Sequence, residues 1–267
     1  SYPRFDLSRL PLIGWLSSRL AIAIVRAVVA SVFVVTIAAG YFGKQESFSN
    51  LIVPMVWVAW WVGFAFASAL LANVWQLANP LRTLFDVAQA IVGGRLGFGW
   101  TYPRWLGCWP AVAFFAVFAW LELVWPANDV PRLLARAMLG YAILTWAGMI
   151  VFGRDAWLER AEAFSVAFGV LGRFAPLAPA DGARLVLRPY GAGLLDGDVA
   201  SASFTMFVLT MLSTVTFDGF LETPLFQDLL NWVYTNPRVG NLVYEISEYG
   251  ISDTTLVKTV ALGAFPL

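Results

Sequence analysis

The chain has 267 residues, of which 60% are hydrophobic and only 13% are charged, and its mean hydropathy is +0.72. A soluble globular domain carries about 25% charged residues, so this composition excludes a soluble domain and predicts an integral membrane protein. The formal net charge is zero, which gives no electrostatic reason to expect nucleic acid as a partner. The partners that we expect are the lipid bilayer and other membrane protein subunits.

Five stretches are apolar enough to cross a bilayer as helices, which takes about 20 residues each. They cover residues 20–42, 51–77, 105–125, 132–152 and 201–217. The second stretch ends in a polar run that closes with Asn79 and Pro80. The sequence therefore predicts an all-α fold, with one transmembrane domain over residues 1–267 built as a polytopic helical bundle.

Two further apolar segments are too short to cross. The segment "AEAFSVAFGVLG" (161–172) is flanked by Arg160 and Arg173, which favours an interfacial or re-entrant helix. The last residues, 255–267, are typical of the beginning of another span, so we expect either that the chain is cut there or that a partner chain supplies the rest. The segment 153–200 is the longest predicted extramembrane part, and alternation around Val186 predicts a small hairpin within 183–200.

The distribution of Lys and Arg predicts the orientation in the membrane. If the N-terminus, the loop 78–104 and the segment 153–200 share one side, that side holds eleven basic residues and the other holds four. The eleven are Arg4, Arg9, Arg19, Arg82, Arg95, Arg104, Arg154, Arg160, Arg173, Arg184 and Arg188, and the four are Lys44, Arg132, Arg238 and Lys258. The expected location is the bacterial inner membrane, with the N-terminus in the cytoplasm and the protein crossing several times.

Three carboxylates are candidates for function. Asp218 and Glu222 are four residues apart, which would put both on one helix face, where they could bind a hard cation or relay protons. Glu122 lies near the end of its predicted span, and ionisable groups inside spans are suspected of function. The favoured alternative is structural: Glu122 reaches the membrane interface, and the last helix ends at Asp218 and Gly219, with Pro224 blocking its continuation.

A fourth candidate is a cluster of charges in "GRDAWLERAEAFS" (153–165). It comprises Arg154, Asp155, Glu159, Arg160 and Glu162. The favoured interpretation is a charged amphipathic helix that lies on the cytoplasmic face of the membrane.

The chain contains no histidine, which removes the commonest general base and the commonest transition-metal ligand. Its one cysteine, Cys108, lies in an apolar run. We therefore predict no cofactor and no metal site, and in particular no haem or copper held by this chain alone. The residue pattern identifies no catalytic group.

Several stretches together resemble a family of bacterial inner-membrane proteins, many of whose members are labelled fenitrothion hydrolase. The stretches are "NVWQLANPLRTL", "YPRWLGCWPAV", "LGYAILTWAGMIVFGRDAWLERAEAFSVAFGVLGRFAPL", "LRPYGAGLL" and "TVTFDGFLETPLF". The resemblance implies a membrane protein of a two-component organophosphate-hydrolysing system. Family members continue into further spans that contain histidine, so the resemblance also implies that activity dependent on those spans would need a second polypeptide or is missing.

Three functions follow as expectations. The first is a subunit of a larger membrane complex without catalysis of its own. The second is a membrane-bound hydrolase of phosphotriesters that a second chain completes. The third is a component of an ion or proton path in a transporter, in which Glu122, Asp218 and Glu222 would take part.

Overall fold

A computed structural model describes residues 2–7, 18–180, 184–196, 200–248 and 250–265. In these ranges, five helical segments are long and apolar enough to cross a membrane. They are α2 (Arg19–Phe42), the segment Ile52–Leu70, the segment Arg104–Leu123 that contains α7 (Trp109–Leu123), α8 (Pro131–Phe152) and α11 (Ala202–Leu221). The predicted all-α helical bundle is confirmed, with five helical segments of the length and apolarity that a span requires.

The second span differs most from its predicted bounds, because it ends at Leu70 and not near residue 77. It consists of α3 (Ile52–Pro54), the π-helix η2 (Met55–Val62) and α4 (Gly63–Leu70). Asn73 then caps a separate helix, α5 (Val74–Ala78), by accepting a hydrogen bond from the amide of Gln76 at 3.2 Å. Asn79 caps α6 (Pro80–Val92) in the same way. An asparagine side chain that accepts such a bond favours a new helix start over continuation.

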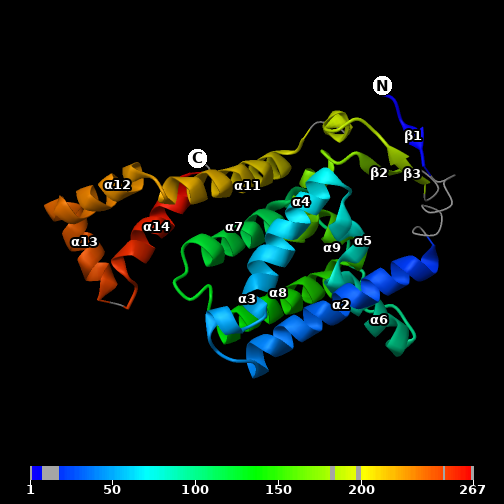
Figure 1. The fold of residues 1–267 in the computed structure, drawn as a ribbon, viewed down its shortest axis with the longest axis horizontal. Coiled ribbons are helices and arrows are strands. Elements are labelled where there is room, and N and C mark those ends of the chain that lie inside the picture. Colours follow the sequence, from blue (N-terminus) through cyan, green and yellow to red (C-terminus); the bar gives the residue numbers. More distant parts are fainter. Residues whose placement is uncertain (1, 8–17, 181–183, 197–199, 249, 266–267) are drawn as a thin grey trace.

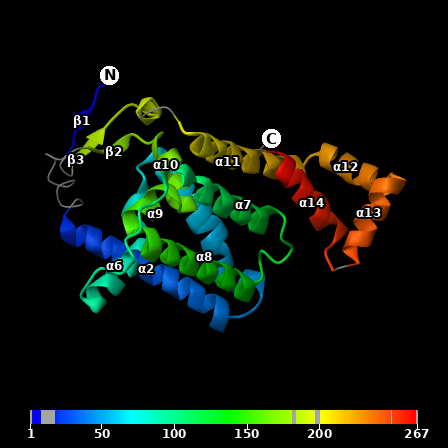
Figure 2. The same cartoon turned by 180° about the vertical axis from the view of Figure 1, so that it is seen from behind.

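α2 and α8 are antiparallel neighbours, with Gly40 near the end of α2 against Ala135 near the start of α8, whereas α7 and α11 run parallel, with Phe115 beside Phe207. α8 lies between α2 and α7, and α7 packs along α11 (Figure 2). The 3-10 helix η1 (Ser47–Ser49) belongs to the connection from α2 to α3, and η3 (Arg104–Leu106) precedes α7. Much of the interior is aromatic: Trp60 contacts Phe164 with ring centroids 4.5 Å apart, and Phe118 contacts Phe164 at 4.9 Å. Such contacts contribute beyond the area that they bury.

The segment after α8 turns back into the bundle as a hairpin of α9 (Arg154–Arg160) and α10 (Ala163–Gly172). α9 packs along α8, and α10 packs against α4, α5 and α7. Most residues of α10 are buried inside the protein. Residues 153–172 therefore return to the bundle and do not form an excursion away from it, and α10 does not lie on the surface of the protein as an interfacial helix would.

A small antiparallel sheet follows the hairpin. Its strands are β1 (Phe5–Asp6), β2 (Leu177–Ala180) and β3 (Arg184–Leu187), in the order β1-β3-β2, and the short helix η4 (Ala192–Leu195) comes next. The predicted hairpin is present but begins at Leu177, and the N-terminal strand joins it. The N-terminal strand and the segment 153–200 therefore meet at one end of the molecule.

The C-terminal part projects beyond the bundle (Figure 1). α11 continues through Asp218 and Gly219 to Leu221, so the predicted helix end at these residues is wrong. Pro224 does not stop the chain from being helical, because it is the first residue of α12 (Pro224–Thr235). At this position a proline sacrifices no helical hydrogen bond.

We call α12, α13 (Pro237–Ser247) and α14 (Asp253–Ala264) the arm. α14, which begins two residues before the predicted partial span (255–267), returns to α11 and α7. Trp120 donates a hydrogen bond to Thr259 at 3.0 Å, and the Phe265 ring packs 5.1 Å from Phe217. This segment therefore finds a helical neighbour within its own chain.

Candidate functional site

Glu162 occupies the tip of the α9–α10 hairpin and is completely buried. Its nearest partner on a spanning helix is Tyr141, in the middle of α8. Glu162 accepts hydrogen bonds from Trp75 Nε1 (3.1 Å), Asn79 Nδ2 (3.4 Å), the Tyr141 hydroxyl, the Phe164 amide (3.0 Å) and the amide and hydroxyl of Ser165 (2.8 and 2.5 Å). The sequence grouped this carboxylate with surface charges, whereas the structure places it in the core.

Two glycines allow the hairpin to fold back. Gly153 adopts φ +88°, a conformation that glycine tolerates best, and turns the chain from α8 into α9. At Gly148 a Cβ atom would lie 2.1 Å from the indole ring of Trp157, so only glycine lets α9 approach α8 this closely. The indole then stacks on Phe152 with ring centroids 5.9 Å apart. This close packing carries Glu162 towards Tyr141.

The surroundings of Glu162 determine what it can do. An ionised carboxylate offers about four lone-pair sites, and the donors around Glu162 occupy them. It also caps α10 through two backbone amides, where a negative charge interacts favourably with the helix dipole. Glu162 therefore has no free acceptor site for a ligand, and it joins the α5–α6 segment, α8 and α10 to one another.

The other charges of the predicted cluster lie on the outside of the hairpin. Arg154 forms an ion pair with Asp86 of α6 at 2.5 Å and a second pair with Asp155 at 2.8 Å. The hydrogen bond from Arg154 holds the pKa of Asp155 below its usual value. Glu159 and Arg160 are exposed. The predicted cluster is therefore divided. Arg154 joins α9 to α6 through Asp86, while Glu162 points into the bundle.

The three remaining candidate carboxylates gather where α7 and α11 lie side by side. Glu122 is partly buried near the end of α7, and its carboxylate and that of Asp218 are close enough to interact electrostatically. Asp218 and Glu222 are both exposed, one helical turn apart, with Glu222 capping α11. Asp218 lies in the last turn of α11 and Glu222 directly follows the helix, and Glu122 is a neighbour of Asp218.

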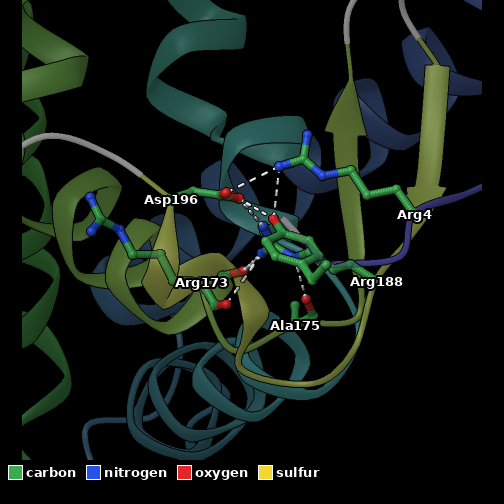
Figure 3. Close-up of polar contacts among 7 residues, drawn as sticks. Arg4, Arg173, Ala175, Arg188 and Asp196 are labelled. Atoms are coloured by element: carbon green, nitrogen blue, oxygen red, sulfur yellow. Dashed lines mark hydrogen bonds and ion pairs between the residues drawn. The ribbon is translucent and has the colours of Figure 1, made fainter.

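Arginines tie the sheet to the hairpin at the opposite end of the molecule (Figure 3). Arg188 donates hydrogen bonds to the carbonyl oxygens of Gly172 (2.9 Å), the last residue of α10, and of Ala175 (3.0 Å), three residues beyond it. Arg188 also pairs with Asp196 at 3.4 Å. Arg4 reaches the same carboxylate at 3.0 Å. Arg173 points away in Figure 3, and its guanidinium lies 5.1 Å from the ring of Phe204. Arg188 thus satisfies a carbonyl group at the end of α10. Through the shared Asp196, Arg188 and Arg4 also connect the N-terminal strand to this end of α10.

No sequence pattern indicates the partners of Glu162. Asn79 is predicted to close the second stretch and Trp75 lies inside it, whereas both side chains donate to the same carboxylate. Across the described residues, no group of three or more His, Cys, Asp and Glu side chains is placed to hold a metal ion. Comparison of the chain with protein-family models, with curated proteins and with solved structures finds no match.

Proposed function

We propose that this chain is a multi-pass subunit of a larger membrane assembly and that the arm is the surface that binds a partner protein. The observation that supports this proposal most directly is the exposure of large apolar side chains on the arm. Its own core is small, formed by Phe226, Val233 and Val257 and their neighbours. Outside that core it exposes Leu225, Trp232, Tyr234, Leu242, Tyr244, Ile251 and Val260. Exposed apolar surface that includes Trp and Tyr is characteristic of protein interfaces.

The charges of the arm indicate what kind of partner it fits. Between residues 224 and 264 there are four acids (Asp228, Glu245, Glu248 and Asp253) and two bases (Arg238 and Lys258). None of the six forms an ion pair within the part of the chain that the structure describes. Asp218 and Glu222 extend this acidic surface along the end of α11. An acidic surface disfavours anionic lipid and favours a protein with an apolar face edged by Lys or Arg.

A double substitution tests this assignment. Trp232→Ala together with Tyr244→Ala should release the chain from its assembly, because exposed aromatic anchors typically contribute about 2 kcal/mol or more each to an interface. The measurement is the size of the assembly in native electrophoresis after extraction with a mild detergent. Trp105→Ala is the control, since Trp105 lies outside the arm and is exposed even more (79%) than Trp232 (54%). An unchanged assembly in the double variant, or a wild-type chain that extracts as a monomer, would contradict the proposal.

We also propose the bacterial inner membrane as the location, with the basic end of the molecule in the cytoplasm. The pairing of β1 with β3 and the ion pair between Arg154 and Asp86 support a common side for the basic segments. In a Cys108→Ser background, Arg95→Cys should not react with a membrane-impermeant maleimide in intact cells, whereas Arg238→Cys on the arm should react. The reverse labelling pattern would show that the orientation is inverted.

The hydrolase and ion-path functions remain alternatives without an observation that favours them. A phosphotriester hydrolase would draw its catalytic groups from a second chain, which the proposed assembly would supply. An ion path would need Glu122, Asp218 and Glu222 to face a passage through the bundle. Two of the three are exposed on the outside of α11 and its end, which fits a contact surface better.

A further inference from the structure

A large cavity lies inside the bundle, and we call it the chamber. Its volume is about 530 Å³. Its wall includes Val32 of α2, Val56 and Trp60 of η2, Phe118 of α7, Tyr141 of α8 and Phe164 of α10. Apolar cavities of about 150 Å³ already stay dry and take up a molecule such as benzene, and small-molecule sites usually measure about 300–1,000 Å³. The chamber is therefore large enough for a ligand.

One wall of the chamber is the π-helix η2. Such wide helical turns are rare and occur frequently at functional sites. Met55, Val56, Trp57, Ala59 and Trp60 of η2 all border the chamber, so this wall is formed largely by the unusual segment. The π-helix is thus a second observation, independent of volume, that indicates a binding site here.

The lining offers a ligand almost nothing polar. The indole nitrogens of Trp57 and Trp75 donate to the Asn128 carbonyl (3.0 Å) and to Glu162 (3.1 Å). The Tyr141 hydroxyl also donates to Glu162, and the Thr36 hydroxyl donates to the Val32 carbonyl within α2. Water needs two to four polar partners to occupy a cavity, and these groups already have theirs. The matching ligand is a hydrocarbon.

The chamber is accessible from the lipid side. Val32, Val117 and Leu144 border it and are exposed on the surfaces of α2, α7 and α8. A shallower groove along α2 shares Val32, Thr36 and Met55 with the chamber. Because these helices are candidate spans, this opening would face the acyl region of a bilayer. The arm contributes no residue to the chamber.

We propose that the chamber binds one hydrocarbon chain from the membrane, which enters beside α2 and lies against η2. Two sources share this chemistry, the acyl tail of a phospholipid and the tail of an isoprenoid lipid. The site depends only on residues of the bundle, so it stands independently of any partner on the arm.

Photo-crosslinking of the full-length protein in liposomes tests the proposal and distinguishes the sources. One sample contains a phospholipid with a diazirine on its acyl tail, and the other contains a diazirine-bearing geranylgeranyl alcohol. Mass spectrometry then maps the labelled residues. Val56 is 4% exposed and lines the chamber, so label there reports an occupied chamber, whereas label at the exposed Leu212 of α11 reports surrounding lipid.

Filling the chamber provides the decisive comparison. Gly140 borders the chamber, and a Cβ atom there would meet nothing within 4 Å, so Gly140→Leu should fit without a clash. Gly219→Leu on α11, where a Cβ atom likewise meets open space, is the matched control. We expect about tenfold less label at Val56 in Gly140→Leu, as the displacement of about two buried methylene groups would produce, and no change in Gly219→Leu.

The outcomes divide clearly. Label at Val56 from one probe only, lost in Gly140→Leu, identifies the source of the chain. Label at Val56 that persists in Gly140→Leu, or that neither probe produces, overturns the proposal. Label at Leu212 checks that each variant is inserted, and Ala137→Leu fills the chamber from a second position if Gly140→Leu is not recovered.

Discussion

Glu162→Ala should lower the free energy of unfolding by about 3–5 kcal/mol, the largest effect that we expect from any single side-chain truncation in this chain. The substitution leaves Trp75 Nε1 and the Tyr141 hydroxyl without their acceptor inside the bundle, at about 1–3 kcal/mol for each buried donor. It also removes the cap of α10, which contributes about 1 kcal/mol. Chemical unfolding of the purified protein in mixed micelles, followed by tryptophan fluorescence, measures the change.

The matched control is Glu159→Ala, one turn earlier on the exposed side of α9. It should change the free energy of unfolding by no more than about 0.5 kcal/mol, as surface substitutions usually do. Glu162→Gln should fall between the two, because an amide oxygen can still accept while the amide NH₂ opposes the surrounding donors. Equal effects of the two alanine substitutions would mean that the hydrogen bonds around Glu162 contribute little to stability.

The spans could be predicted because length and hydropathy are properties of a continuous segment. α2 and α8 begin and end within about one residue of the predicted bounds. The second span could not be bounded in this way. Among residues 74–78 only Gln76 is polar, so the segment can be counted with the span, and the contacts of Asn73 and Asn79 with the backbone are what begin new helices there. Hydropathy is averaged over a window of many residues, so a single capping asparagine does not show in it.

The site around Glu162 could not be predicted, because its partners are far apart in the sequence. Trp75 is 87 positions away, Asn79 is 83 and Tyr141 is 21. Local spacing grouped Glu162 with Glu159 and Arg160, which do lie on the surface. What separates them is the direction in which α9 enters the bundle, and that direction depends on a contact between two helices.

The contact between α8 and α9 leads to the last prediction. Alanine at two glycines of α8, Gly148 and Gly140, should change the free energy of unfolding in opposite directions. At Gly148 the added methyl group of alanine would lie 2.1 Å from the ring of Trp157, which is itself buried and stacked on Phe152. A rigid indole held on both sides cannot move away cheaply, so Gly148→Ala should cost about 2–3 kcal/mol in unfolding free energy. At Gly140 the same methyl group meets open space, so Gly140→Ala should gain about 0.5–1 kcal/mol from helix propensity.

The mechanism can be separated from a general intolerance of α8 by removing the ring instead of the glycine. If the clash with Trp157 is the cause, adding Trp157→Leu to Gly148→Ala should cost less than the sum of the two single substitutions, because the ring that obstructs the methyl group is gone. The same unfolding titration measures all four variants. Strictly additive losses, or a loss at Gly140 as large as that at Gly148, would show that the close approach of α9 to α8 does not depend on the missing side chain. A combined cost below the sum would mean that the absence of a Cβ atom at Gly148 is what lets the Trp157 ring, and with it α9, pack this closely against α8.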